Sequence, residues 1–223
     1  MLVCLDPGHG GTDPGAVGNG LKESAVTLKI AQYLKPLLEH NGITVIMTRR
    51  DESTVSLTER CRFANAKQAN LFVSIHINAG GGTGAETHIV GNGGQAEKLA
   101  QKVQPYIAKG WRNRGIKVSN FQVLRGTVMP AILTENGFID NTSDAQRLKE
   151  DNALKQIAEA HARGVCDYFG ITFKTPPEVT GGSQTGDNDP DVYLSVRVRT
   201  SKSDALVNEI IGMGYACKRL DLA

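Results

Sequence analysis

The feature that most restricts the fold is the alternation of short apolar runs with longer amphipathic segments over residues 1–170. Short runs rich in β-branched residues predict strands, whereas apolar positions three or four residues apart predict helices. Strands that alternate with helices are typical of an α/β fold, in which a twisted, mostly parallel sheet carries helices on both faces. We expect strands at 2–5, 43–48, 71–77, 86–90 and 130–135, and helices at 23–40, 57–69, 99–107 and 154–169.

The composition changes after residue 171, which suggests a second region. Residues 172–191 are rich in Pro, Gly, Thr, Ser and Asp and lack apolar periodicity, so we expect a linker there. Residues 192–223 have the pattern of one small βαβ unit, which is too short to bury its own core. We therefore expect a main domain at 1–171, followed by a unit that packs on a second copy, on the main domain or on a partner.

Charge and hydropathy argue against two classes of partner. The formal net charge is +2, which does not indicate a nucleic-acid partner, and no apolar segment approaches the ~20 residues of a membrane helix. The N-terminal MLVCLDPG has neither a basic region nor a small-residue cleavage site, so we expect synthesis in the cytoplasm without a signal peptide. The scattered cysteines are expected to be reduced and mostly buried: Cys4, Cys61, Cys166 and Cys217.

The glycine-rich segment LDPGHGGTDPGAVGNG, residues 5–20, follows the first predicted strand and resembles a phosphate-binding loop only superficially. It contains no G-x-x-x-x-G-K-[ST] sequence and no G-x-G-x-x-G sequence, so neither nucleotide-binding motif is present. The glycines need another explanation. We expect Gly8, Gly10 and Gly11 to leave room for the imidazole of His9 and for a group bound to it.

Two histidines and a glutamate fall where ligands collect in such a fold, at the carboxyl ends of strands. They are His9, His76 and Glu23, and two imidazoles with one carboxylate suit one Zn²⁺ ion with a free position for water. Their wide spacing is not a compact metal motif, so hydrogen-bonding duty for His9 and His76 remains open from the residues alone. The other histidines, His40, His88 and His161, have positions that favour structural roles.

Glu135 ends the otherwise apolar predicted strand PAILTE, which we expect to stop at Asn136–Gly137. A carboxylate there is costly to bury without a partner or a task. A structural ion pair would satisfy it. Beside a metal-activated water, Glu135 would instead act as a general base.

Four blocks of the chain occur in the order LDPGHGGTDPGAVGNGLKE, TRRDESTVSLTERCRFAN, LFVSIHINA and FQVLRGTVMPAILTENGFIDN. In these blocks, over about residues 2–170, the chain resembles the zinc-dependent N-acetylmuramoyl-L-alanine amidases of the type-3 family, found in phage endolysins and bacterial autolysins. The resemblance implies that His9, Glu23 and His76 bind zinc and that Glu135 is the catalytic carboxylate. It also implies a sheet flanked by helices, as the alternation of elements does.

The implied activity is hydrolysis of the amide between N-acetylmuramic acid and L-alanine of the stem peptide in bacterial peptidoglycan. Release by a holin or by cell lysis would bring such an enzyme to the wall. Because stem peptides carry carboxylates, we expect docking at the span 98–125, which contains no acidic residue. Reversing the charges of Arg112 and Arg114 is then expected to weaken binding to wall material. Arg60 and Asn78 lie in matching blocks, where structural support is the expected role.

Three other classes remain open from the sequence. A non-haem iron enzyme also uses two histidines and one carboxylate. A cell-wall-binding module without catalysis and a protein partner of the lysis machinery are the others. The unit 192–223 resembles half of a sporulation-related peptidoglycan-binding repeat, which implies wall binding or a homodimer formed by two tails.

Overall fold

The computed structural model describes residues 1–177 of the 223-residue chain. The chain divides into two units, Met1–Glu178 and Val179–Ala223, and the structural statements below concern the first. The predicted βαβ unit and most of the predicted linker lie outside the described residues. Within residues 1–177, no helix has the length and apolar character needed to cross a membrane.

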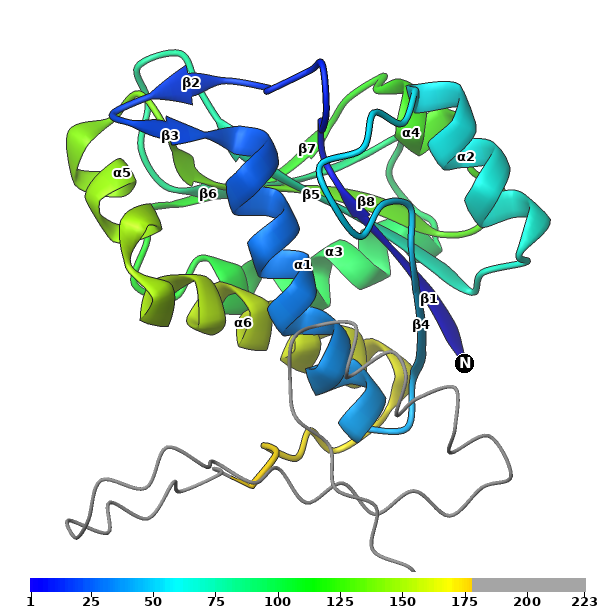
Figure 1. Ribbon diagram of the computed structural model, residues 1–223. Coiled ribbons are helices and arrows are strands. Elements are labelled where there is room, and N and C mark those ends of the chain that lie inside the picture. Colours follow the sequence, from blue (N-terminus) through cyan, green and yellow to red (C-terminus); the bar gives the residue numbers. More distant parts are fainter. Residues whose placement is uncertain (178–223) are drawn as a thin grey trace, which may run out of the picture. The chain divides into compact units, whose positions relative to one another are not determined.

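A six-stranded sheet forms the centre of the described region, in the order β4-β1-β5-β8-β6-β7 (Figure 1). Neighbouring strands are parallel except for β6 and β8, which pair antiparallel, so the predicted mostly parallel sheet is confirmed. A small hairpin lies apart from this sheet. The strands of the sheet are β1 (Leu2–Pro7), β4 (Thr44–Met47), β5 (Leu71–Asn78), β6 (Ala85–Ile89), β7 (Asn113–Val118) and β8 (Ala131–Phe138), and those of the hairpin are β2 (Val17–Gly18) and β3 (Leu21–Lys22).

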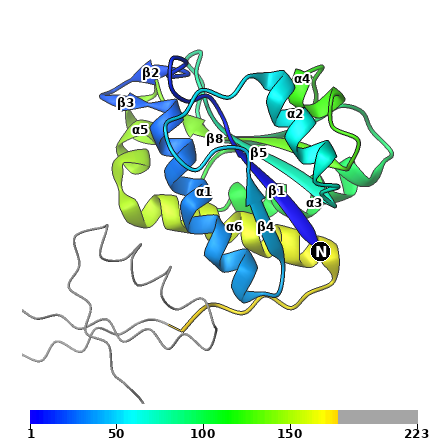
Figure 2. The same ribbon diagram turned by 45° about the vertical axis from the view of Figure 1, so that its right-hand side comes forward.

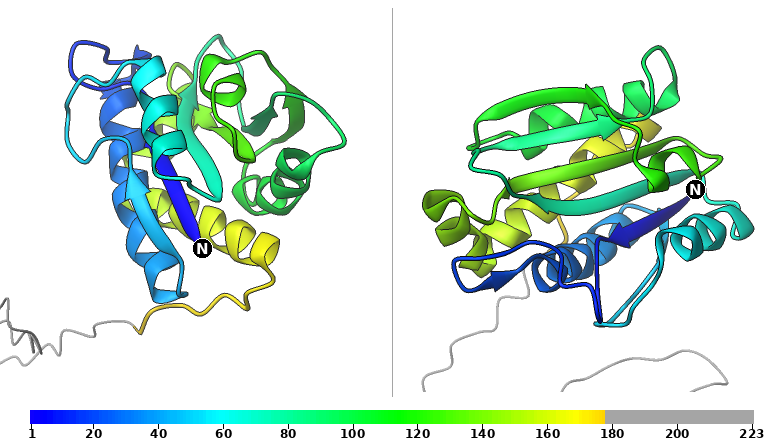
Figure 3. Two further views of the ribbon diagram at one scale, coloured as in Figure 1. Left: turned by 90° about the vertical axis from the view of Figure 1, so that its right-hand side faces the viewer. Right: turned by 90° about the horizontal axis from the view of Figure 1, so that it is seen from above.

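Helices cover both faces of the sheet, as predicted (Figures 2 and 3). One face carries three long helices that pack on the larger apolar core, and α6 contacts both α1 and α3. The other face carries two shorter helices that contact each other over a smaller core. The helices are α1 (Glu23–His40), α3 (Gln95–Ile107) and α6 (Asp151–Phe169) on the first face, α2 (Leu57–Ala66) and α4 (Gln122–Arg125) on the second, and α5 (Thr142–Lys149) before α6.

Local sequence explains the bounds of the best-predicted helices. Helix α1 has the predicted span, and it ends before Gly42, whose φ of 77° is a conformation that glycine adopts readily. Helix α2 begins with a capping box, in which Ser56 accepts from the backbone N–H of Glu59 and the Glu59 carboxylate accepts from the N–H of Ser56. These caps satisfy backbone groups that the first turn of a helix leaves without partners.

The second face of the sheet is covered along only part of its strands. Helices α2 and α4 pack on Phe72 and Ala131, near the starts of β5 and β8. Because side chains alternate between faces along a strand, His76 of β5 shares this face with Phe72, and Glu135 of β8 shares it with Ala131. In the described part of the chain, no helix packs over this second half. His76 and Glu135 are partly exposed on this half, so a ligand can contact them, and we call it the open half of the sheet.

The cysteines that the structure describes agree with the prediction. Cys4, Cys61 and Cys166 are buried and free, and Cys217 lies outside the described residues. Burial raises the pKa of the Cys4 thiol above its ordinary value, so this thiol stays protonated at neutral pH. None of the three contributes to the open half of the sheet.

Candidate active site

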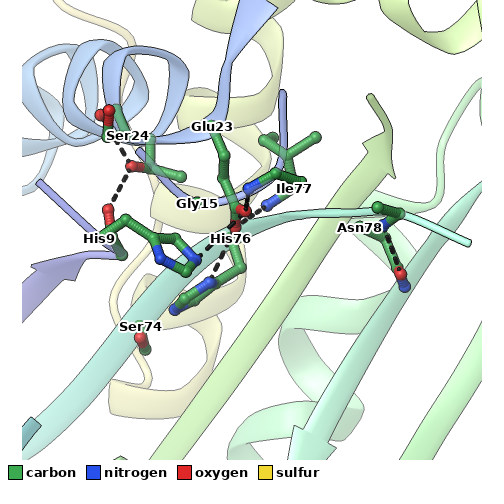
Figure 4. Close-up of polar contacts among 12 residues, drawn as sticks. His9, Gly15, Glu23, Ser24, Ser74, His76, Ile77 and Asn78 are labelled. Carbon is green, nitrogen blue, oxygen red and sulfur yellow. Dashed lines mark hydrogen bonds and ion pairs between the residues drawn. The ribbon is translucent and has the colours of Figure 1, made fainter. Parts of the chain in front are cut away.

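The predicted ligands His9, Glu23 and His76 meet at the carboxyl ends of β1 and β5 (Figure 4). One ligand atom from each residue lies within 4.8 Å of the other two. The Glu23 carboxylate lies between the rings, with its oxygens 3.2 Å from His9 Nε2 and 2.9 Å from His76 Nδ1. The ring centroids are 4.9 Å apart and the rings are nearly perpendicular. Two imidazoles and a carboxylate therefore converge on one position.

Glu23 is held from both sides by the backbone. Its carboxylate accepts hydrogen bonds from the N–H groups of Ala16, at 2.9 Å, and Ile77, at 3.0 Å. Burial alone would raise the pKa of Glu23, but its contacts with His76 and His9 outweigh burial and lower that pKa. Glu23 is therefore a fixed, ionised carboxylate at neutral pH.

The loop that carries His9 is fastened by two buried arginines. His9 itself has a left-handed backbone with φ of 60°, which is uncommon outside glycine. Arg60 donates to the carbonyl of His9 at 2.6 Å, and Arg49 donates to the carbonyls of Gly8 and Ser24 at 2.8 and 2.7 Å. Since Ser24 lies in the first turn of α1, Arg49 connects the His9 loop to the helix that presents Glu23.

Asp13 orients the ring of His9. Its carboxylate lies 2.8 Å from His9 Nδ1, on the opposite side of the ring from Glu23. A carboxylate in this place fixes the tautomer that leaves Nε2 available to a metal. Sequence reasoning did not identify Asp13 or Arg49, although both lie in the blocks that resemble the amidase family.

Glycine makes room in this site, but not in the way predicted. A side chain at Gly8 would meet the ring of His76 at 2.3 Å, so Gly8 accommodates His76 and not His9. Gly15, at φ of 66°, leaves room for the His9 ring and the Glu23 carboxylate. A Cβ at Gly15 would lie 2.6 Å from an atom of each of these two groups. Gly10 and Gly11 face other loops instead.

A buried ion pair lies beneath the loop. Arg60 donates to Asp6 at 2.8 Å, and both residues are almost fully buried. The same carboxylate accepts from the hydroxyls of Thr48 and Ser74, at 2.6 and 2.7 Å. Arg60 therefore has the structural role that the sequence suggested, because its contacts are to the protein.

Replacing Arg60 by methionine is expected to lower the free energy of unfolding by about 3–5 kcal/mol, because Asp6 would be left buried without its charged partner. Chemical denaturation of the two proteins measures the difference. The matched control is Arg62→Met, on the same helix but exposed, which should change stability by less than ~0.5 kcal/mol. Equal stability of the Arg60 and Arg62 variants would contradict this account of the pair.

Glu135 lies beside the three convergent residues, in the strand next to His76. It pairs with His76 of β5 on one side and with Glu86 of β6 on the other. The strand does not stop at Asn136–Gly137 as predicted. It continues to Phe138, which pairs with Asn78 of β5 after a register shift, and Gly137 takes φ of 86° at this irregularity. A side chain at Gly137 would also meet the ring of Trp111 at 2.7 Å.

The Glu135 carboxyl has no structural ion pair among residues 1–177. Its Oε2 is buried and has no hydrogen-bond partner in that part of the chain. Burial, and after it the charges of Glu23 and Glu86, raises the pKa of Glu135 well above its ordinary value. A buried carboxyl oxygen without a partner is costly and is typical of a functional group.

Glu86 is the centre of a second polar cluster on this face, and sequence reasoning missed it. Its carboxylate accepts from Asn78 at 2.9 Å, from Arg114 at 2.7 Å and from Lys117 at 2.8 Å. Burial would raise the pKa of Glu86, but Lys117 and Arg114 lower it to about 2. His88 lies 3.2 Å from the same carboxylate, and the predicted structural roles of Asn78 and His88 fit these contacts.

The span 98–125 does not form one basic surface. Lys98 and Lys102 lie on α3, which packs on the face of the sheet opposite the site. Arg114 and Lys117 lie on β7 and reach Glu86 on the site's face. Of the span's basic residues, Arg114 and Lys117 on β7 are the ones that contact Glu86, so we restrict the proposed docking region to β7.

The remaining histidines lie away from the three convergent residues. His161 is buried between the hydroxyl of Thr134, at 2.9 Å, and the carbonyl of Ile157, at 2.7 Å. His40 lies in the last turn of α1. The structure thus brings together the four residues named from the sequence and leaves these two histidines out of the site.

The family model and the related proteins found by comparison agree on one protein family. The family model for N-acetylmuramoyl-L-alanine amidase, Amidase_3, matches residues 3–167. The amidase CwlM of Bacillus licheniformis is 45% identical over 177 residues, which are 77% of this chain and 70% of that protein. The endolysin of Bacillus phage SPP1 is 42% identical over 184 residues, covering 78% of this chain and 68% of that protein.

Solved structures agree with the fold. The catalytic domain of the amidase CwlV from Bacillus (Paenibacillus) polymyxa var. colistinus superposes with a TM-score of 0.74 at 32% identity, covering 77% of this chain and 99% of that one. An amidase from Clostridium difficile 630 gives 0.73 at 37% identity, covering 76% and 96%. By its matched residues, its relatives and its fold, the chain belongs to the N-acetylmuramoyl-L-alanine amidase family of hydrolases.

Proposed function

We propose that this chain hydrolyses the amide bond between N-acetylmuramic acid and the L-alanine of the peptidoglycan stem peptide. The observation that carries the proposal is the buried, unpartnered Oε2 of Glu135 in the strand next to His76. A proton acceptor lies there beside three convergent metal-binding groups, which is the pairing that metal-assisted hydrolysis requires. The family assignment favours this hydrolase over a non-catalytic wall-binding module or a lysis partner.

We assign one Zn²⁺ ion to His9, Glu23 and His76. The donor set fits, because neutral imidazole nitrogens and a carboxylate oxygen are ordinary zinc ligands and converge within 4.8 Å. The same set suits ferrous iron, but amide hydrolysis transfers no electrons and needs no redox metal. When bound, the ion would supply Lewis acidity that polarises the scissile carbonyl and activates water at neutral pH.

The chain's own groups would then position the reactants and move the proton. Asp13 and the backbone N–H groups of Ala16 and Ile77 hold the ligand side chains in place. Glu135 would take a proton from the attacking water and return it to the leaving nitrogen of alanine. Burial raises the pKa of Glu135, which makes its carboxylate a stronger base toward the attacking water.

The substrate places the site of action at the bacterial cell wall. One relative is a phage endolysin and another is a sporulation-specific amidase of Bacillus subtilis, so delivery by a holin or by cell lysis is consistent with relatives of either origin. We assign catalysis to residues 1–171 and the linker to 172–191. Residues 192–223 are proposed to bind the wall or to form a homodimer.

Digestion of purified muropeptides, followed by mass analysis, tests the bond that is cut. We expect intact sugars that end in the lactyl carboxylic acid, together with intact stem peptides that have a new amino-terminal alanine. Inactive protein should leave the muropeptides unchanged. Fragments cut within the glycan or within the peptide would refute the proposal.

A further inference from the structure

Arg114 is held on two sides while one end of its guanidinium remains available. Its Nε donates to Glu86 at 2.7 Å, and its Cζ lies 4.9 Å from the centre of the Phe138 ring. Among residues 1–177 its two Nη groups have no hydrogen-bond partner within the protein, and a quarter of the side chain is exposed. A guanidinium fixed in this way offers its parallel N–H groups to a planar anion, and a carboxylate matches that geometry.

The charge around Arg114 favours an anion. Arg114 and Lys117 both contact the same oxygen of Glu86, so two cations share one carboxylate. His88 adds no charge at neutral pH, because burial outweighs its contact with Glu86 and lowers its pKa. The cluster therefore carries an excess positive charge on the open face of the sheet.

The position of the cluster relates it to the reaction. Glu86 is the direct neighbour of Glu135 across the β6–β8 pairing, and neighbouring strands are ~4.8 Å apart. An extended peptide advances about 3.4 Å per residue. The Arg114 guanidinium therefore lies within the reach of the first two peptide residues that follow a bond cleaved beside Glu135.

We propose that Arg114, supported by Lys117, binds a free carboxylate on the second residue of the stem peptide and makes the enzyme prefer peptides in which that group is not amidated. This inference rests on the proposed function. The peptide arm of the substrate is the arm that carries carboxylates, so the cluster also fixes which side of the site receives the peptide. Glu86 acts as a positioning residue, because it aims Arg114 without contacting the substrate.

Two synthetic substrates test the preference. Both contain N-acetylmuramic acid linked to a dipeptide, and they differ only in a free carboxylate or a primary amide on the second residue. Because a free carboxylate can form a charged, bidentate hydrogen bond with Arg114, we expect the parent enzyme to have about 10- to 100-fold higher kcat/KM for the free acid than for the amide. Arg114→Gln should bring the ratio of the two kcat/KM values close to 1, because the free acid loses its charged partner, and Arg114→Lys should retain part of the preference.

Lys98→Gln is the matched control, since Lys98 is an exposed cation on the opposite face and the preference should be unchanged. A merely structural role for Arg114 would lower the rates for both substrates equally, which would overturn the inference. Equal cleavage of the two substrates by the parent enzyme would overturn it as well, and would leave the proposed function intact. Cleavage of neither by the parent enzyme would overturn both.

Discussion

Replacing Glu135 by glutamine is expected to slow amide hydrolysis by about 10²- to 10⁴-fold, the contribution typical of a positioned general acid–base. Glutamine keeps the shape of the side chain but cannot accept and return the proton. Because Glu135 is not one of the three convergent donors, the variant should bind as much metal as the parent protein. Release of amino groups from purified cell walls measures the rate, and elemental analysis measures the metal.

The control for this variant is Glu39→Gln, which alters an exposed carboxylate near the end of α1 that pairs with Lys35. Its activity should equal that of the parent. Retention of more than about a tenth of the activity by Glu135→Gln would assign the proton transfer to another group.

The same substitution is expected to stabilise the protein once the metal has been removed with a chelator. Burial, followed by the charges of Glu23 and Glu86, raises the pKa of Glu135, so the folded protein retains a proton that the unfolded chain releases above pH 4.5. Stability therefore falls as the pH rises through this window. Thermal melting should show Glu135→Gln above the parent at pH 7 and close to it near pH 4. A lower melting temperature at pH 7 would contradict this.

Removal of the metal is expected to reduce hydrolysis by at least ~10³-fold, since Lewis acidity is worth several kcal/mol in such sites and each ~1.4 kcal/mol is tenfold. Added zinc should restore the chelated parent enzyme. His76→Ala removes one of the three convergent donors. At zinc concentrations that fully restore the parent enzyme, this variant should therefore bind no metal and show no activity. Activity assays at increasing zinc concentration make the comparison.

His40→Ala is the matched control, since it removes an exposed histidine at the end of α1 and should leave zinc binding unchanged. Protons should compete with the ion. Burial lowers the pKa of His9, but its contacts with Glu23 and Asp13 outweigh burial and raise it, so more zinc should be needed as the pH falls below this raised pKa. Full activity in the presence of a strong chelator would exclude a metal mechanism.

The sequence predicted what local patterns determine. Helix α1 has clear apolar spacing and a glycine after its end, and its predicted and observed spans agree. His9 was identified within the glycine-rich segment, Glu23 at the start of a predicted helix, and His76 and Glu135 at the ends of predicted apolar strands. The blocks that contain them also resemble a family.

The features that were missed depend on contacts between distant segments. Strand β7, NRGIKV, has three polar residues and a glycine, so its pattern does not indicate a strand. Its position is set instead by pairing with β6. Without β7, the contacts of Arg114 and Lys117 with Glu86 could not be predicted. Similarly, Asn136–Gly137 resembles a turn, but β8 continues through it because Asn136 pairs with Ala85 of β6 and Phe138 pairs with Asn78 of β5.

One surface of the sheet carries the apolar core and the other carries the site, so substitutions on the two surfaces have different effects on the enzyme. The three long helices pack on one surface through the larger apolar core, so substitutions there are limited by folding. The groups proposed to bind the peptide carboxylate lie on β7 at the edge of the sheet, two strands from the Glu135 carboxyl, with Glu86 of β6 between them. Replacements at this edge can redirect the enzyme toward walls of different chemistry while the metal ligands and the apolar interior stay as they are.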